Sequence, residues 1–279
     1  MFTTISCIGQ NAWNVKYENP AHPNCKSVTT RFAIALYGGI SGTSGKFDPY
    51  KSVNYVNITQ TASDLKRYVV HPSGGEFDTF MHSRVMSPNI QNLLLNLYKP
   101  VTYDFESNYL TLASKYRHLA RVTSLPEKEI SRWSSISSVL MLIRKYQEKV
   151  GIVYSHIYLT RPDIGIWRNI DLRRYCVDVF YLNNCFPPFW QYQCQADFHF
   201  VFGQKLLQAF SLIIAHFKNG SAHFTGRQGH LTNHEIIHFV KKMDCKWAAD
   251  HVVVQRHEEV LRKGGDKRFR EKYFSTFPG

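Results

Sequence analysis

Short apolar runs alternate with helically patterned segments along this chain, and the alternation predicts a fold class. Runs rich in β-branched, aromatic and aliphatic residues are typical of strands buried on both faces of a sheet. Such runs occur at Arg31–Tyr37, Phe77–His82, Val153–Leu159, Val177–Leu182 and Phe198–Phe202. Apolar residues at helical spacing predict helices at Ile90–Tyr98, Ser134–Val150, Gln204–Phe217 and from Asn233 onward. A last short strand is predicted at Asp250–Val254.

The order of these elements predicts an α/β fold with a mostly parallel central sheet flanked by helices. We find no internal repeat, and 279 residues are enough for one large domain. Lys99-Pro100 and Gly151 are expected to end the two longer helices that precede them, because proline and glycine punctuate helix ends.

The segment from Tyr154 to Trp167 joins a buried strand to three residues of chemical interest, Arg161, Pro162 and Asp163. Proline cannot donate to a sheet ladder, so the strand should stop there and leave an arginine and a carboxylate at its carboxyl end. Ligands of open α/β sheets bind at that edge. A guanidinium can bind phosphate oxygens while a carboxylate holds a divalent cation, although a plain surface ion pair is an equally good interpretation.

Charge and cysteine content narrow the possible partners and compartments. The chain has 34 Lys+Arg against 21 Asp+Glu, a formal net charge of +13, which favours nucleic acid, an anionic membrane face or phosphorylated small molecules as partners. The first residues lack the pattern of a secretion signal, and no run approaches the ~18 apolar residues that span a bilayer. A cytoplasmic location with free, buried thiols is therefore expected, although Cys176, Cys185 and Cys194 could also form a zinc site or a disulfide.

A glycine-rich loop follows the first strand, from Gly38 to Phe47. Its spacing does not fit the P-loop pattern, and Phe47 stands where that pattern needs a metal-binding Ser or Thr. A loop after a first strand can still offer backbone N–H groups to a nucleotide. Gly38, Gly39 and Ser41 are its candidate contacts.

His234, Glu235 and His238 form an HExxH pattern, in which two histidines one helical turn apart bind zinc and the glutamate acts as general base. The same histidines could simply lie on the outer face of a helix. Candidate site residues also stand at strand ends: Asp78 and His82 flank one strand and Asp197 precedes another. Each of these could face a substrate or cap a turn.

Taken in order, these motifs resemble glycosyltransferases of the GT-A type, especially small soluble enzymes of bacterial polysaccharide clusters and large algal viruses. The resemblance covers roughly residues 30 to 255. Six short motifs in the same order carry it. The first three are the glycine-rich turn after the first strand (Ala33–Gly42), an Asp-x-Phe-x-His segment (Asp78–His82) and a Leu-Tyr-Lys-Pro stretch (Leu97–Pro100). The other three are Thr-Arg-Pro-Asp (Thr160–Asp163), a segment from Asp to Gly (Asp197–Gly203) and a helix that opens with Glu (Asn233–Ile237).

The resemblance implies roles for particular residues. Asp163 stands in the place of the metal-binding Asp-x-Asp motif of that family, with Arg161 where the first Asp would be. The resemblance also implies that Mn²⁺ or Mg²⁺ is held by Asp163 together with a C-terminal histidine, for which His251 is the first candidate and His257 the second. Gly203 would lie near the donor sugar, and Glu235 would deprotonate the acceptor, with Asp197 as the second candidate base.

The resemblance implies transfer of a sugar from a nucleotide-diphosphate sugar to a hydroxyl of a glycan or glycoprotein acceptor. The implied donor is a UDP-sugar, with UDP-xylose as one candidate. Within a single glycosyltransferase domain, residues from about 30 to 165 would bind the nucleotide sugar. Residues from about 166 to 279, which include the basic C-terminal tail, would bind the acceptor. The resemblance implies no nucleic-acid partner and, for a viral protein, the host cytoplasm. Two alternatives stay open: a zinc hydrolase built on the HExxH pattern, and a basic nucleic-acid-binding protein.

Overall fold

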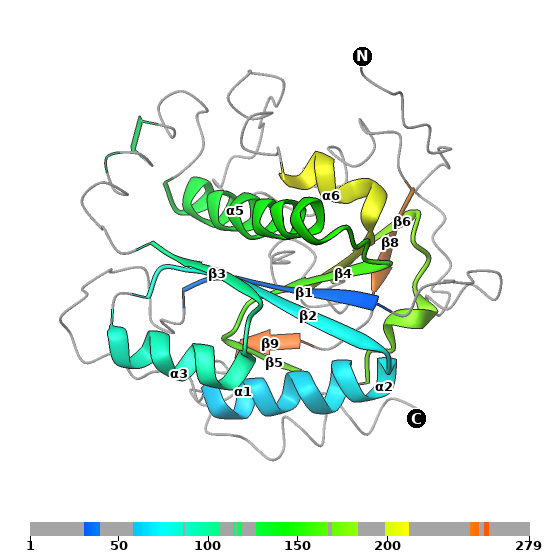
Figure 1. The fold of residues 1–279 in the computed structure, drawn as a ribbon, viewed down its shortest axis with the longest axis horizontal. Coiled ribbons are helices and arrows are strands. Elements are labelled where there is room, and N and C mark those ends of the chain that lie inside the picture. Colours follow the sequence, from blue (N-terminus) through cyan, green and yellow to red (C-terminus); the bar gives the residue numbers. More distant parts are fainter. Residues whose placement is uncertain are drawn as a thin grey trace, which may run out of the picture.

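A seven-stranded sheet in the order β3-β2-β1-β4-β7-β6-β8 organises the computed structural model (Figure 1). The residues that the structure describes are 31–39, 58–85, 87–106, 114, 117–118, 127–166, 169–183, 199–211, 246–250 and 254–256. In chain order the strands of the sheet are β1 (Arg31–Gly38), β2 (Glu76–Ser83), β3 (Thr102–Phe105), β4 (His156–Thr160), β6 (Val179–Asn183), β7 (His199–Gly203) and β8 (Lys246–Asp250).

Strand direction confirms the predicted fold class. β1 pairs in parallel with β2 and β4, β2 with β3, and β6 with β8. Only β7 runs against its neighbours β4 and β6 within this sheet. The described chain is therefore α/β with a mostly parallel central sheet, and strands from before and after residue 165 belong to that one sheet.

Helices cover both faces of the sheet (Figure 1). The long α5 (Glu127–Val150) and α6 (Gln204–Ser211) lie on one face. The other face carries α1 (Ile58–Leu65), a π-helical turn η1 (Lys66–Val70), α2 (His71–Ser73) and α3 (Pro88–Tyr98). A short antiparallel ribbon of β5 (Ile164–Ile166) and β9 (Val254–Arg256) lies beside α1, and a 3₁₀ turn η2 (Leu172–Arg174) contacts α2.

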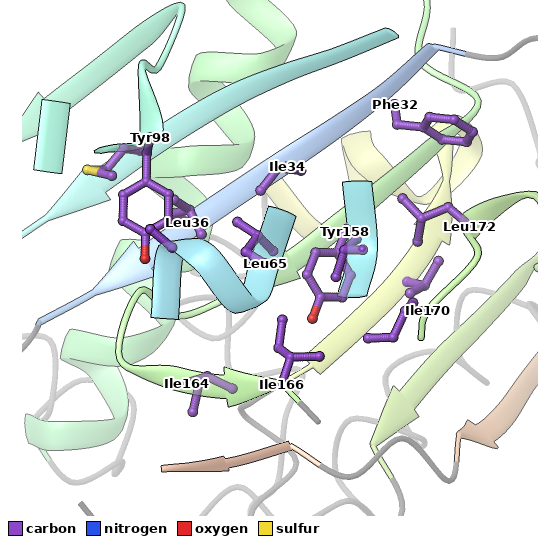
Figure 2. Packing of buried hydrophobic residues seen from close by; sticks show 14 of the residues in the cluster. Phe32, Ile34, Leu36, Leu65, Tyr98, Tyr158, Ile164, Ile166, Ile170 and Leu172 are labelled. Carbon is purple, nitrogen blue, oxygen red and sulfur yellow. The ribbon is translucent and has the colours of Figure 1, made fainter. Parts of the chain in front are cut away.

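β1 shows why the apolar runs form a sheet covered on both sides. Alternate side chains of a strand point to opposite faces, and all of its residues from Phe32 to Gly38 are buried. Ala33, Ala35 and Tyr37 pack in the core under α5 and α6. Phe32, Ile34 and Leu36 pack with Leu65, Tyr158 and Ile164 in the second core under α1 (Figure 2). Burial of each large apolar side chain stabilises the fold by about 1.5–3 kcal/mol.

Most predicted elements are confirmed, with shifts at their ends. The helix predicted at Ser134–Val150 begins earlier, at Glu127, and the strand before Pro162 ends at Thr160 as expected. Of the strand predicted at Asp250–Val254 the structure describes only the two end residues: Asp250 is the last residue of β8 and Val254 the first of β9. None of the helices in the described ranges is long and apolar enough to cross a membrane.

Cys176 corrects the prediction of free thiols, because it is disulfide-bonded in the structure. The other five cysteines lie outside the described residues. Pairing is decided by which cysteines the fold brings together, and no local Cys spacing in the sequence reveals it. Disulfides are rare in reducing compartments, so this bond does not support the cytoplasmic expectation.

Candidate functional site at the carboxyl edge of the sheet

The order of the strands defines one place on the sheet where a ligand is expected. From β1 the chain builds outward to β2 and β3, and then returns to place β4 on the other side of β1. Such a reversal is a topological switch point, and ligands of α/β sheets bind outside the carboxyl ends of the strands there. In register, Gly38 of β1 lies beside Ser83 of β2, and Leu36 lies beside Thr160 of β4. These strand ends form the candidate site.

Gly38 ends β1 in a backbone conformation that side chains disfavour, with φ of +93°. Its N–H donates to the Ser135 hydroxyl of α5 at 2.9 Å, and its carbonyl accepts from the Ser83 hydroxyl at 2.8 Å. Both backbone polar groups of Gly38 are thus bound within the protein. Gly38 fixes the direction in which Gly39 and the following loop leave the sheet, and its own N–H is not aimed at a ligand.

His82 lies at the end of β2 and is 1% exposed. Its Nδ1 is 2.7 Å from the Ser135 hydroxyl, and its Nε2 is 3.8 Å from a Glu106 carboxylate oxygen and 3.9 Å from Asp104. The Ser135 hydroxyl accepts from the Gly38 N–H and donates to the His82 carbonyl oxygen at 3.3 Å. This network joins the ends of β2 and β3 to the glycine turn.

Arg161 and Asp163 follow the end of β4 and bind each other. Arg161 Nε donates to Asp163 Oδ1 at 2.7 Å, and its Nη2 donates to Oδ2. The Asp163 side chain is 2% exposed and that of Arg161 is 15% exposed. The pair is therefore a bidentate and nearly buried ion pair.

The backbone between Arg161 and Asp163 is bound by residues of α1 and α3. The Pro162 carbonyl accepts from the Thr61 hydroxyl at 2.8 Å, and the Tyr98 hydroxyl lies 3.3 Å from the same oxygen. Burial raises the pKa of Tyr98, and the carboxylates of Asp163 and Asp64 raise it further, against the opposing effect of Thr61. Tyr98 thus stays a protonated donor over the ordinary pH range.

The predicted Mn²⁺ or Mg²⁺ does not fit the described part of this site. Both carboxylate oxygens of Asp163 accept hydrogen bonds from Arg161, so a cation on Asp163 would stand next to a guanidinium. Within the described ranges, no group of three or more His, Cys, Asp or Glu side chains could hold a metal ion. The other predicted ligand, His251, lies outside those ranges.

Two predicted site residues lie at the opposite, amino edge of the sheet. Asp78 Oδ2 accepts from Arg31 Nε at 3.0 Å, from Arg31 Nη2 at 2.9 Å and from the Tyr154 hydroxyl at 2.7 Å. Asp78 and His82 are on the same strand, and strand geometry separates them by roughly 13 Å. Gly203 pairs with His156, the first residue of β4, so it also lies away from Arg161.

Gly203 has a structural reason to be glycine. A Cβ built there would lie 2.0 Å from the Val177 carbonyl oxygen, so the backbones meet too closely for any side chain. The structure therefore does not bring Asp78 and Gly203 together with Gly38, His82, Arg161 and Asp163.

The remaining candidates cannot be placed. Outside the described residues lie the predicted nucleotide contact, the two candidate bases and the zinc-pattern histidines: Ser41, Asp197, Glu235, His234 and His238. Their roles stay predictions.

Sequence reasoning missed several residues that build this site. Ser135 occupies a fully buried helical position next to Ile136, and within the serine-rich stretch Ser134–Ser138 no sequence signal singles it out. Thr61 belongs to α1, a helix that the apolar pattern did not predict. The last residues of β6 and β8, Asn183 and Asp250, pair in register at the carboxyl edge of the same sheet; this placement follows from the strand order and not from the local sequence.

No family model and no curated protein matches the chain. Three solved structures are similar to it over most of their length. A glycosyltransferase involved in glycosylation of the major capsid of PBCV-1 has 9% identity and a TM-score of 0.36, with 79% of this chain and 81% of that chain covered. The 4-diphosphocytidyl-2C-methyl-D-erythritol synthase of Anaerococcus prevotii has 11% identity and a TM-score of 0.38, covering 88% and 96%. A nucleoside-diphosphate-sugar pyrophosphorylase of Vibrio cholerae has 8% identity and a TM-score of 0.38, covering 83% and 99%. Similarity at these scores does not assign a function to the chain.

Proposed function

We propose that the protein is a glycosyltransferase that binds a nucleotide-diphosphate sugar at the carboxyl edge of its sheet. One observation supports this most directly. The switch point beside β1 carries a fixed glycine turn on one side and, after β4, an arginine held in a bidentate, nearly buried ion pair on the other. Backbone turns at strand ends accommodate nucleotides, and arginine binds phosphate oxygens in pairs.

The proposed reaction is a displacement at the anomeric carbon of the donor sugar. The acceptor hydroxyl oxygen forms the new bond to that carbon, while the bond to the diphosphate oxygen breaks and its electron pair leaves with the nucleoside diphosphate. A carboxylate takes the hydroxyl proton; Glu235 is our first candidate and Asp197 the second. Arg161 stabilises the charge on the departing diphosphate through charge-assisted hydrogen bonds.

The finer assignment is a UDP-sugar donor, with UDP-xylose as the first one to test, and a glycan or glycoprotein acceptor. The formal net charge of +13 suits a polyanionic donor. We propose an inverting reaction because a single base and one displacement suffice for the groups named here. No observation on the described residues favours the zinc-hydrolase or nucleic-acid-binding alternatives.

Thermal unfolding and product analysis test this function. The full chain is unfolded with free nucleotides and with nucleotide sugars, and a donor at 100 times its dissociation constant should stabilise the folded state by about 2.7 kcal/mol. Release of UDP that depends on a glycan acceptor, and its loss in Glu235→Gln with donor binding kept, would support transfer by that base. A protein that responds to no nucleotide would refute the proposal. Release of pyrophosphate from a nucleoside triphosphate would instead indicate nucleotidyl transfer.

A further inference from the structure

We infer that the donor diphosphate is bound by Arg161 without a divalent cation, and that Asp163 is the residue that positions this arginine. The inference rests on the proposed function and names how its site meets the phosphate charge. It departs from the metal-binding role that the sequence predicted for Asp163.

The first argument is the occupancy of the Asp163 carboxylate. Arg161 donates to both of its oxygens, from Nε and from Nη2, and the side chain is 2% exposed. A cation bound to Asp163 would need one of these oxygens and would lie beside a positive guanidinium. Like charges at such short range repel strongly in a partly buried site.

The second argument is charge balance. Two carboxylates that share one divalent cation carry no net formal charge, and Arg161 with Asp163 carries none either. An arginine in place of the first carboxylate therefore supplies the positive charge that a cation would otherwise bring.

The third argument is that the pair cannot easily rearrange to admit a cation. The Pro162 carbonyl between its two residues is bound by Thr61 of α1 and lies within reach of Tyr98 of α3. Thr61, Tyr98 and Asp163 are all buried. Because the turn is fixed in this way, the guanidinium stays beside Asp163, and the Arg161 side chain as a whole is 15% exposed. Such a held fork suits paired hydrogen bonds to phosphate oxygens.

The chain contains a matched control for this arrangement. Arg173 donates to Asp171 in the same bidentate manner, from Nε at 2.9 Å and from Nη2 at 2.8 Å. This second pair lies beside α2, where Arg173 also donates to the Pro72 carbonyl. Replacing Arg173 by Ala therefore removes the same kind of ion pair and leaves the residues of the carboxyl edge unchanged.

The test is calorimetric titration of the full chain with UDP and with UDP-xylose, in Mn²⁺ and in EDTA. We expect the dissociation constant to change by less than about twofold between the two conditions, to rise about 10- to 100-fold in Arg161→Ala, and to stay unchanged in Arg173→Ala. Arg161→Lys should recover only part of the affinity, because an ammonium keeps the charge and loses the fork. Asp163→Asn, which keeps the shape of the side chain, should weaken binding equally with and without Mn²⁺.

Direct Mn²⁺ binding, followed by electron paramagnetic resonance, separates the possible failures. A Mn²⁺ site that disappears in Asp163→Asn, together with UDP binding that needs Mn²⁺, would overturn the inference and leave the proposed function standing. A folded protein that binds neither UDP nor UDP-xylose in either condition would overturn both. Circular dichroism of each variant shows that a loss of binding is not a loss of fold.

Discussion

Asp163 and Asp171 are each bound by an arginine two residues away in the chain, yet the two pairs differ in their surroundings. The Asp163 pair has side chains 15% and 2% exposed and is joined through Pro162 to α1 and α3. The Asp171 pair has side chains 53% and 23% exposed and closes a 3₁₀ turn. Exposed ion pairs contribute about 0–1 kcal/mol. The same local chemistry is thus a turn cap in one place and part of a candidate site in the other.

The two edges of the sheet extend this contrast. At the amino edge the Asp78 carboxylate is bound by Arg31 and Tyr154, and burial together with that hydrogen bond raises the pKa of Tyr154. Those groups satisfy one another and stabilise the fold. At the carboxyl edge the buried groups around Gly38 instead hold a turn that leaves the sheet. Under the proposed function we therefore expect substitutions at the amino edge to change stability alone, and substitutions at the carboxyl edge to change both stability and ligand binding.

The glycines at the two edges give the largest expected difference. Gly203→Ala should lower the free energy of unfolding by more than about 3 kcal/mol, because its Cβ would overlap the Val177 backbone at 2.0 Å. At Gly38 no atom lies within 4 Å of the added Cβ, so Gly38→Ala should cost only about 1–2 kcal/mol from its positive φ. Urea denaturation compares the two, and equal costs would contradict the close approach at Gly203.

The next largest effect is expected at Asp78. Asp78→Ala removes the acceptor of Arg31 and Tyr154 and should lower the free energy of unfolding by about 2 kcal/mol, the value of hydrogen bonds to a charged group. UDP affinity, measured well below the unfolding temperature, should not change. A large loss of UDP affinity in a folded Asp78→Ala protein would return this residue to the site and break the distinction between the edges.

These contrasts also show what the sequence could and could not predict. The apolar run of β1 is buried on both faces, so its composition alone predicted a central strand. Pro162 marked the end of β4 by its missing N–H. By contrast, the direction of β7 depends on how a distant segment pairs, which no local pattern determines.

The same limit applies to the candidate site residues. Asp78 and His82 both flank one strand, and composition gave no reason to prefer either. In the structure Asp78 lies near the amino end of β2 and His82 near its carboxyl end. Ligands are expected at the carboxyl end beside the switch point, and that place is known only once the strand order is known. Ser135 contacts Gly38 across 97 residues of sequence, and long-range pairing of this kind is invisible to periodicity.

Ser135 offers a smaller and more local test of the carboxyl edge. Ser135→Ala removes the acceptor of the Gly38 N–H and the partner of His82, so it should cost about 1–2 kcal/mol of stability and also weaken UDP binding. Ser137→Ala is the control: it lies on the same helix, and its hydroxyl donates to the Ser211 carbonyl of α6. Calorimetric titration with UDP should separate the two variants, and identical affinities would show that the turn does not serve the ligand.

The smallest effect is a pH dependence expected from the amino edge alone. Burial lowers the pKa of His156 below its ordinary 6.5, although its hydrogen bond with the Tyr175 carbonyl, 2.8 Å long, acts in the opposite direction. The unfolded chain therefore takes up a proton that the folded protein resists. The contribution of His156 to stability is complete above pH 6.5 and is lost progressively as the pH falls below it.

His156→Gln should flatten the dependence of the unfolding free energy on pH between about pH 7 and pH 5. The exposed His71, replaced by Gln, is the control and should leave the slope as it is. UDP affinity should be unaffected by the His156 change, since His156 starts β4 and Arg161 follows its other end. Parallel pH curves for wild type and His156→Gln would show that this buried imidazole does not set the acid sensitivity of the fold.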